Sequence, residues 1–327
     1  MNDTLANIKT NLITGFLGVG KTSTILHLMT QKPVDEKWSV LVNEFGSVGI
    51  DGAIYKAKGI AVKEIPGGCM CCAAGVPLQV AINQILRATK PQRLLIEPSG
   101  LGHPKRVLDT LRGEHFQGVL DIRASVCLID PRHLLEKRYT THANFIDQIA
   151  MADVLMANKM DKSDSKTRQH LSAYITTIQP PKLDIIQTEF GRLDVSILDL
   201  IPKTDHKAQY PHHHAHSSTD VITTDGYQSI GCHFPKVILF SFKKISILFK
   251  QLDHERIKAI LHTDEGWKVF NMINGQLQIT EIRGSADNRV EIISHVATAT
   301  NKHRTEDANK IMNKQQLTNA LKRCSIS

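Results

Sequence analysis

Aromatic residues are scarce in this sequence: Phe, Trp and Tyr together make up 5% of 327 residues. Proteins that bind single-stranded nucleic acid commonly stack the bases on aromatic side chains, so this scarcity disfavours nucleic acid as a partner. The sequence also lacks an apolar run approaching 18 residues and a charged start followed by an apolar stretch. We therefore expect no membrane partner, no secretory signal and a cytoplasmic location.

Cysteine is also infrequent, with six residues in the whole chain, and three of them lie at positions 69, 71 and 72. Such a low and clustered content excludes a small disulfide-bonded scaffold and favours a reducing compartment with metal or redox chemistry. The net charge of +8 is modest for this length. It suits a phosphate-bearing small ligand as well as nucleic acid, and does not separate the two.

The overall composition is that of a globular protein, with 41% hydrophobic and 22% charged residues, and the length predicts about two domains. Short apolar runs alternate with helical patterns such as Leu78, Ile82, Ile85 and Leu86. This alternation predicts an α/β domain with a mostly parallel sheet over residues 1–203. The predicted strands are 11–14, 39–43, 60–65, 94–97, 124–130, 154–158 and 184–187.

The composition changes after residue 203. Residues 204–231 are polar, contain five histidines between His206 and His216, and are predicted to form a linker. Residues 232–327 are predicted to form a small α+β domain with a basic tail, which is either a weak helix or solvated. Its predicted strands are 234–242, 245–249, 267–273, 276–282 and 289–294, and its predicted helix is 253–261.

Residues 15–22 read Gly-Phe-Leu-Gly-Val-Gly-Lys-Thr, a G-x-x-x-x-G-K-T phosphate loop between an apolar strand and a helical segment. Its glycines let backbone amides point toward a phosphate, Lys21 would reach the β- and γ-phosphates, and the Thr22 hydroxyl would bind Mg²⁺. A glycine-rich turn without a ligand is the alternative. The predicted phosphate-binding residues are Gly15, Gly18, Val19, Gly20, Lys21, Thr22 and Ser23.

Asn158-Lys159-Met160-Asp161 follows the apolar strand residues 154–157, at the sheet edge where doubly wound folds bind ligands. In an N-K-x-D motif the Asp161 carboxylate accepts hydrogen bonds from N1–H and the exocyclic amine of guanine, a donor pair that adenine lacks. A simple polar turn is the alternative. We expect Asn158, Lys159 and Asp161 to select GTP.

The apolar strand 94–97 ends in Glu97, which is followed by Pro98, Ser99 and Gly100. Glu97 is predicted to hold Mg²⁺ through water or to orient the attacking water, and the Gly100 amide to contact the γ-phosphate. Lys21, Thr22 and Glu97 are thus the predicted catalytic set. A solvent-facing Glu97 is the alternative. With no convincing glutamine or arginine to accelerate hydrolysis, we expect slow intrinsic turnover.

Residues 66–72 read Pro-Gly-Gly-Cys-Met-Cys-Cys. Three thiolates from Cys69, Cys71 and Cys72 would leave one tetrahedral position open, as suits an exchangeable site for zinc; cobalt and copper(I) also fit. A redox pair and buried small hydrophobes are the alternatives. The fourth ligand stays open among Glu44, Asp51, a linker histidine and water, and the histidine run is either a loose metal-capture segment or a solvated loop.

Together these motifs resemble the CobW-type family of P-loop GTPases. The similarity covers Thr-Gly-Phe-Leu-Gly-Val-Gly-Lys-Thr at 14–22, Gly-Cys-Met-Cys-Cys at 68–72, Glu-Pro-Ser-Gly at 97–100 and the motif at 158–161. Asn-Glu-Phe-Gly at 43–46, followed by Val-Gly-Ile-Asp at 48–51, looks like the first switch of that family. The resemblance implies GTP hydrolysis coupled to delivery of zinc or cobalt to a client metalloprotein. A regulatory GTPase with a structural or redox cysteine cluster, and a non-catalytic metal buffer, are the alternatives.

Overall fold

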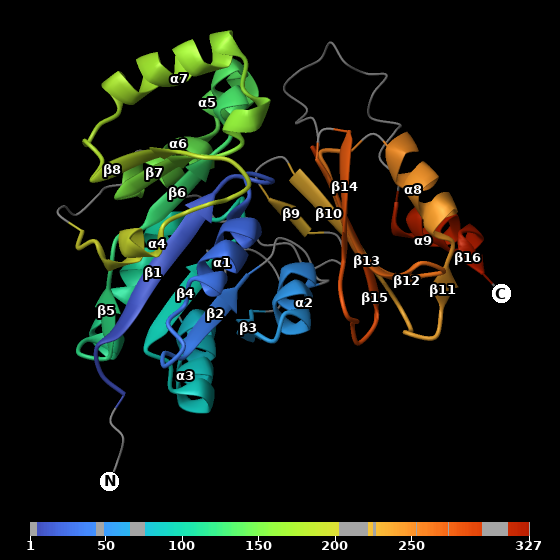
Figure 1. Ribbon diagram of the computed structural model, residues 1–327, viewed down its shortest axis with the longest axis horizontal. Coiled ribbons are helices and arrows are strands. Elements are labelled where there is room, and N and C mark those ends of the chain that lie inside the picture. The colour runs from blue at the N-terminus through green and yellow to red at the C-terminus, as the bar shows by residue number, and fades with distance from the viewer. Residues whose placement is uncertain are drawn as a thin grey trace. The chain divides into compact units, whose positions relative to one another are not determined.

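A computed structural model of the chain is shown in Figure 1. It describes residues 5–43, 49–65, 76–202, 222–224, 227–252, 254–273, 275–295 and 313–326. The contacts among Cα atoms divide the chain into two compact units. The first comprises Met1–Asn43, Ile60–Ile65 and Cys69–His214, and the second Glu44–Gly59, Pro66–Gly68 and Ala215–Ser327. The second unit thus takes a segment from the N-terminal part of the chain, and the domain boundary at residue 203 stays a prediction.

The first unit is built on an eight-stranded sheet in the order β3-β2-β4-β1-β6-β7-β8, with β5 also paired to β1. All its strand pairs are parallel, as expected for a P-loop GTPase domain. The strands are β1 (Ile8–Gly15), β2 (Trp38–Val42), β3 (Ala61–Glu64), β4 (Arg93–Glu97), β5 (Leu120–Ile122), β6 (Val126–Ile129), β7 (Val154–Ala157) and β8 (Asp184–Gln187).

Helices separate most of these strands along the chain, because parallel neighbours need crossover connections. They are α1 (Lys21–Thr30), α3 (Val76–Thr89), α4 (Pro104–Leu111), α5 (Lys137–Thr140), α6 (Ala143–Met151) and α7 (Ser165–Thr177). The predicted apolar stripe of α3 is buried, and it packs with α4 against β1, β2 and β4 in one core cluster. Period-3.6 patterning therefore placed this helix and its buried face correctly.

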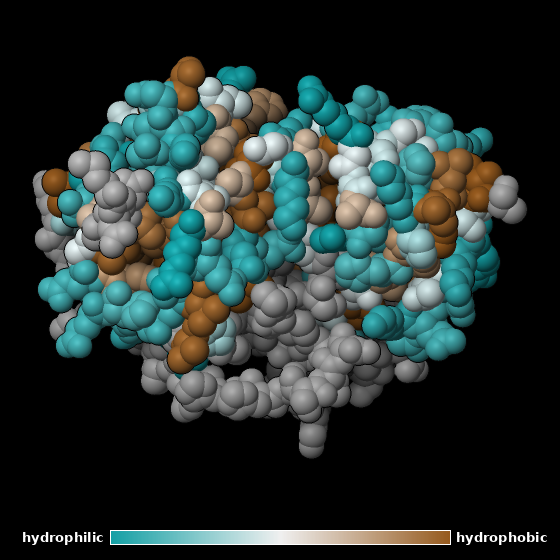
Figure 2. All heavy atoms as spheres, turned by 90° about the horizontal axis from the view of Figure 1, so that it is seen from below, coloured by the Kyte–Doolittle hydropathy of each residue, from teal (hydrophilic) through white to brown (hydrophobic). Residues whose placement is uncertain are grey.

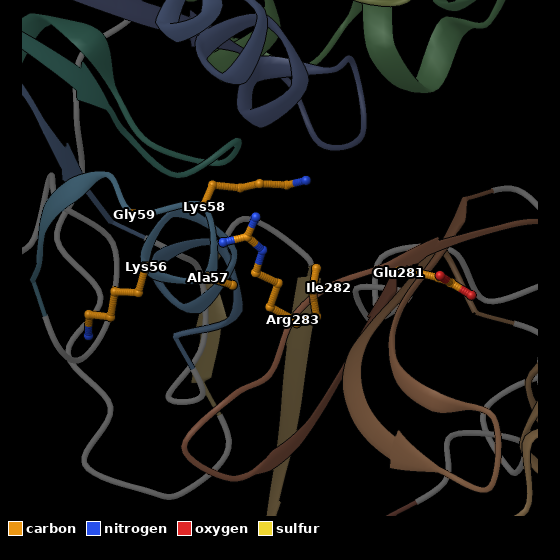
Figure 3. A pocket seen from close by; sticks show the side chains of 7 residues that line it. All are labelled: Lys56, Ala57, Lys58, Gly59, Glu281, Ile282 and Arg283. Carbon is orange, nitrogen blue, oxygen red and sulfur yellow. The ribbon is translucent and has the colours of Figure 1, made fainter.

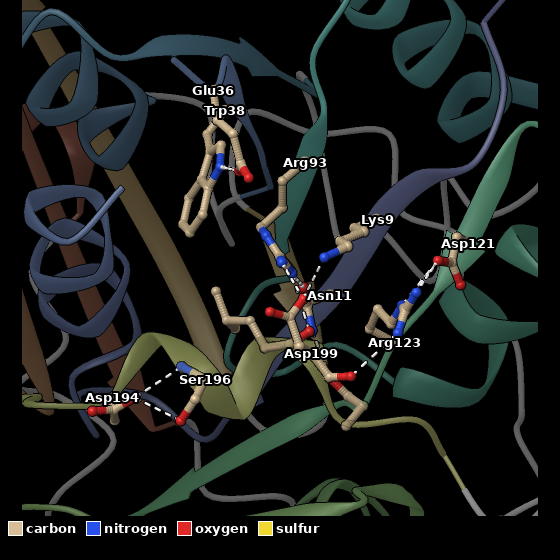
Figure 4. Close-up of polar contacts among 12 residues, drawn as sticks. Lys9, Asn11, Glu36, Trp38, Arg93, Asp121, Arg123, Asp194, Ser196 and Asp199 are labelled. Carbon is tan, nitrogen blue, oxygen red and sulfur yellow. Dashed lines mark hydrogen bonds and ion pairs between the residues drawn. The ribbon is translucent and has the colours of Figure 1, made fainter. Parts of the chain in front are cut away.

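A polar network fixes the amino-terminal ends of β1 and β4 (Figure 4). The buried Arg93 guanidinium donates to Asn11 Oδ1 at 2.7 Å and to Asp199 Oδ1 at 2.6 Å. The Asn11 amide in turn donates to the carbonyl oxygens of Ala124 and Leu198, each at 3.0 Å. These bonds satisfy buried polar groups at one edge of the sheet, and the motif residues lie at the opposite, carboxyl edge.

The second unit is built on a mixed sheet in the order β14-β13-β12-β15-β10-β9, with β11 paired to β12 and β16 to β11. The strands are β9 (Ile222–Thr224), β10 (Tyr227–Phe234), β11 (Leu239–Phe240), β12 (Arg256–Thr263), β13 (Gly266–Ile273), β14 (Gln276–Glu281), β15 (Asn288–His295) and β16 (Ser325–Ile326). The helices α8 (Phe242–Gln251) and α9 (Lys314–Arg323) share a core cluster with the sheet.

Four sequence-based expectations for this unit were wrong. Residues 234–242 were predicted as one strand but comprise the end of β10, a turn, the two-residue β11 and the first residue of α8. Residues 253–261 were predicted as a helix, but β12 occupies most of this range because Ile257, Ala259 and Leu261 alternate into the core. Residues 245–249 were predicted as a strand but lie in α8, whose start is capped by the Ser241 hydroxyl accepting from the Lys244 amide. The strand β10 begins at Tyr227, inside the predicted linker.

Helix α2 (Ile50–Ala57) belongs to the second unit, where it contacts β12 and β15. Asp51 of α2 forms an ion pair with Lys258 of β12, and both side chains are buried. The Arg289 guanidinium of β15 donates to the carbonyl oxygen of Gly49 at 2.7 Å. Because Lys258 alternates with the core residues of β12, α2 packs on the sheet face opposite to α8 and α9.

The described surface is largely polar on the side shown in Figure 2, where apolar residues lie in separate patches among hydrophilic ones. None of the helices in the described ranges combines the length and the apolar character needed to cross a bilayer.

Candidate nucleotide site

The phosphate loop connects β1 to α1. The Lys21 side chain is buried and its ammonium donates to the carbonyl oxygens of Gly15 at 2.8 Å and Phe16 at 3.2 Å. These two bonds connect the last part of the loop to its first residues and fix the lysine side chain at the start of α1. The helix N-terminus and the backbone amides around it provide the positive field that a triphosphate requires.

Asn158 connects the predicted base motif to the phosphate loop. Its side-chain amide donates to the Val19 carbonyl oxygen at 2.9 Å and accepts from the Gly191 amide at 3.0 Å. Gly20 leaves room for this contact, because a Cβ built there would lie 2.5 Å from Asn158 Nδ2. The structure therefore brings the motif at 158–161 to the phosphate loop. Sequence reasoning missed Gly191, whose only signal is a glycine shortly after a strand.

Lys159 and Asp130 form a charged pair beside this motif. Lys159 Nζ lies 3.3 Å from Asp130 Oδ2, and the same carboxylate accepts from the Arg132 guanidinium at 2.7 Å. Burial would raise the pKa of Asp130, but the hydrogen bond from Arg132 and the neighbouring cations lower it to about 2. The Lys159 ammonium is thus paired with a carboxylate that stays ionised at neutral pH. Asp161 stands exposed at the start of the following turn, within reach of solvent and ligands.

Thr22 and Glu97 meet next to the phosphate loop. The Thr22 hydroxyl donates to Glu97 Oε1 at 2.9 Å, and Glu97 is only 3% exposed. A solvent-facing Glu97 is therefore wrong. Parallel pairing of β1 with β4 places the ends of both strands side by side. A hydroxyl and a carboxylate at this point are hard oxygen donors of the kind that Mg²⁺ prefers.

Two polar residues of α6 hold the turn that follows Glu97. Gln148 donates to the carbonyl oxygens of Gly100 at 3.0 Å and Gly102 at 3.1 Å, and Asn144 donates to that of Leu101 at 2.7 Å. A Cβ on Gly100 would lie 2.7 Å from the Leu17 amide nitrogen, so this turn lies directly against the phosphate loop. Sequence reasoning missed Asn144 and Gln148. Two buried amides four residues apart on an apolar helix were the available signal.

Asn43 lies where three segments of the chain converge. Its backbone amide donates to the Glu97 carbonyl oxygen at 2.9 Å, and its side-chain amide donates to the Ile65 carbonyl oxygen at 3.2 Å. Asn43 is the first residue of the predicted first switch, residues 43–51, and Ile65 precedes the segment that carries the cysteine cluster. The backbone and the side chain of one buried asparagine therefore link the start of both segments to the predicted Mg²⁺-binding strand.

The predicted metal ligands Cys69, Cys71 and Cys72, as well as Glu44 and the histidine run, lie outside the described residues. Within the described ranges, no group of three histidine, cysteine, aspartate or glutamate side chains could hold a metal ion. Asp51, a candidate fourth ligand, instead pairs with Lys258. The cysteines elsewhere are buried, and burial raises the pKa of Cys127 to about 12, as expected for an unreactive core thiol.

His133, which follows β6, should make the stability of the first unit depend on pH. It is 3% exposed and stacks on Tyr139, and burial lowers its pKa from 6.5 to about 4. Between these values the unfolded chain binds a proton that the folded chain does not. Stability is therefore full above pH 6.5 and falls toward pH 4 by up to about 3 kcal/mol. Urea unfolding monitored by Trp38 in a Trp267→Phe background measures this slope.

The His133→Phe variant should remove most of that slope, because a phenyl ring keeps the stack on Tyr139 without titrating. The exposed His170 of α7 provides the control, and His170→Gln should leave the slope unchanged. If the stability of His133→Phe falls with pH as steeply as that of the wild type, His133 is not the source of the pH dependence.

Comparison with known proteins gives one family match and several related sequences. The family model described as CobW/HypB/UreG, nucleotide-binding domain, matches residues 9–186. The chain is 41% identical over 307 residues to the zinc chaperone YeiR of Escherichia coli, covering 88% of this chain and 93% of that protein. It is 27% identical over 226 residues to the zinc chaperone CobW of Pseudomonas aeruginosa, covering 60% of each. The chain therefore belongs to the CobW/HypB/UreG family of P-loop GTPases.

Proposed function

We propose that this GTPase is a metallochaperone that carries zinc, or cobalt, on Cys69, Cys71 and Cys72 and releases it to a client metalloprotein according to its nucleotide state. The zinc chaperones YeiR and CobW among its relatives support the cargo. Hydrolysis removes the γ-phosphate contacts, and the two switch-like segments would relax together with the metal site.

The convergence of hydrogen bonds on Asn43 is the observation that carries this proposal. The cysteine segment begins directly after Ile65, and the predicted first switch begins at Asn43. Asn43 is hydrogen-bonded to Ile65 through its side chain and to Glu97, at the end of β4, through its backbone amide. A displacement at the γ-phosphate that moves either segment must therefore strain or break bonds of the same asparagine, which couples nucleotide to cargo.

The remaining site residues have separate tasks in GTP hydrolysis. Lys21 would neutralise the β- and γ-phosphates and Asp161 would select guanine, with Lys159 and Asn158 fixing the motif. Thr22 and Glu97 would hold Mg²⁺, which supplies charge neutralisation for the transferred phosphoryl group. Gly100, held by Gln148, would present its amide to the γ-phosphate. The structure gives Gln148 a structural task, so we still expect slow intrinsic turnover.

The Asn43→Ala variant tests the coupling. In the wild type we expect zinc to bind at least about tenfold more tightly with a non-hydrolysable GTP analogue than with GDP, a coupling of about 1.4 kcal/mol. Removing the side chain deletes the bond to Ile65 while the phosphate loop stays intact. The variant should keep GTP affinity within about threefold and lose most of the coupling. Competition titrations with a zinc-binding dye at fixed pH and Mg²⁺ measure both values.

Asn11→Ala is the matched control, since Asn11 is a buried asparagine of the same sheet whose amide also donates to backbone carbonyls. It should leave the coupling intact, and Cys71→Ser should abolish tight zinc binding. If the wild type binds zinc equally in both nucleotide states, the chain is a regulatory GTPase with a structural or redox cysteine cluster. Nucleotide-dependent zinc binding without any GTP turnover would instead indicate a metal buffer.

A further inference from the structure

A cavity of about 640 Å³ opens in the second unit at the end of α2. Its walls come from the last turn of α2 and the residues around the end of β14, including Lys56, Lys58 and Arg283. This volume lies in the range of ligand-binding clefts. Figure 3 shows Lys58 and Arg283 extending toward the same side of the helix, whereas Lys56 extends the other way.

The cavity carries unbalanced positive charge. Glu281 is the acidic residue of its lining, and its carboxylate is already paired with Lys268 at 2.5 Å. Lys58 and Arg283 are exposed, and across the described ranges neither forms an ion pair or a side-chain hydrogen bond. Two uncompensated cations on separate elements therefore face one concave space.

These cations are not needed to cap α2. The Lys58 amide donates to the carbonyl oxygens of Ile54 at 3.3 Å and Tyr55 at 3.1 Å, and the Gly59 amide donates to that of Lys56 at 2.9 Å. The backbone thus satisfies the terminal carbonyls of the helix itself. The side chains of Lys58 and Arg283 are left for an external anion.

The lining also narrows the class of anion. Ala57 and Ile282 give the cavity apolar wall beside its cations, which suits the methylene groups of extended side chains. No aromatic residue is among the described residues that line it, so these residues offer no platform for stacking bases. Carboxylates carried on a flexible peptide fit this mixture of charge and apolar contact.

We propose that this cavity, formed by Lys58, Arg283 and their neighbours, is the docking site for an acidic peptide segment of the client protein. The inference rests on the proposed function, because it assigns the place where the client would be recognised. The other end of the same helix is held by Arg289 at Gly49 and by Lys258 at Asp51, the last residues of the predicted first switch. One short helix therefore runs from the switch segment to the docking site.

The experiment uses the full chain and a fluorescein-labelled peptide rich in glutamate, with its glutamine counterpart as the neutral probe. Fluorescence anisotropy at low salt should show binding of the glutamate peptide alone, weakening as salt rises. The Lys58→Glu, Arg283→Glu double variant should weaken it at least about tenfold. The Lys243→Glu, Lys250→Glu variant makes the same charge change on exposed positions of α8 and should weaken it less than about twofold.

Equal weakening by both double variants would overturn the proposal, because it would indicate long-range attraction without a site. Tighter binding of inorganic phosphate or of a single-stranded oligonucleotide to the same residues would overturn the assignment of an acidic peptide. Zinc affinity and GTP turnover should be unchanged in the Lys58→Glu, Arg283→Glu variant. If the wild type binds zinc equally well with GDP and with the GTP analogue, the metallochaperone proposal is refuted. The peptide-binding result is measured separately and still decides whether the cavity binds acidic peptides.

Discussion

Replacing Gly20 with alanine should weaken GTP binding by at least about 100-fold, or roughly 2.7 kcal/mol. The backbone of Gly20 has φ +109°, and a Cβ there would lie 2.5 Å from Asn158 Nδ2. The methyl group must displace Asn158, which then loses its bonds to Val19 and Gly191. The substitution therefore disturbs both the phosphate loop and the base motif, because Asn158 connects the two. Titration with a fluorescent GTP analogue measures the loss directly.

Gly118→Ala separates this contact from backbone strain. Gly118 has φ +75°, and a Cβ there meets no described atom within 4 Å. Its alanine variant should cost about 1–2 kcal/mol of stability and leave GTP affinity unchanged. If Gly118→Ala lowers the affinity as much as Gly20→Ala, loss of stability and not the contact with Asn158 is responsible.

Replacing Lys258 with methionine should destabilise the second unit by about 3–5 kcal/mol. Asp51, the ion-pair partner of Lys258, is 6% exposed, and the neighbouring Glu291 on β15 is 4% exposed. Without the lysine, two buried carboxylates share one face of the sheet and lack this cation. Urea unfolding followed by Trp267 in a Trp38→Phe background reports on the second unit, because the chain has two tryptophans, one in each unit.

Lys268→Met is the matched control on the adjacent strand. Lys268 is also buried, but its partner Glu281 has an 80% exposed side chain that water can solvate once the lysine is gone. The control should therefore cost much less than Lys258→Met. Adding Asp51→Leu to Lys258→Met should recover a large part of the lost stability. A double variant as unstable as the single one would show that the ion pair is not the cause.

The phosphate loop was predictable because its chemistry depends on local spacing. Gly20 and Lys21 are one residue apart, and the backbone of a glycine-rich strand-to-helix turn needs little help from the rest of the chain. The apolar stripe of α3 was readable for the same reason. In contrast, Asn144 and Gln148 act on a turn more than forty residues earlier, so their task depends on where α6 packs.

The second unit was harder to predict because both faces of its sheet are covered. In β12, apolar core residues alternate with Lys258, which would mark an exposed face in an isolated hairpin. Here that face is buried by α2, whose Asp51 neutralises the lysine. The partner comes from a distant part of the chain, so no local window contains the reason for the pattern. Packing across long sequence separations overrode the local signal.

The position of α2 in the chain has a consequence for how the protein is made. The ribosome completes α2 by Ala57, but β15, one of the two strands that it contacts, is complete only at His295. At roughly 5–20 residues per second this interval lasts on the order of 10–50 s. During that time the sheet of the second unit is incomplete, although the finished protein buries the side chains of Ile50, Ile54 and Tyr55. Strands β3 to β8 of the parallel sheet are synthesised in this interval. The apolar side chains of α2 must therefore avoid non-native contacts until the second unit can fold.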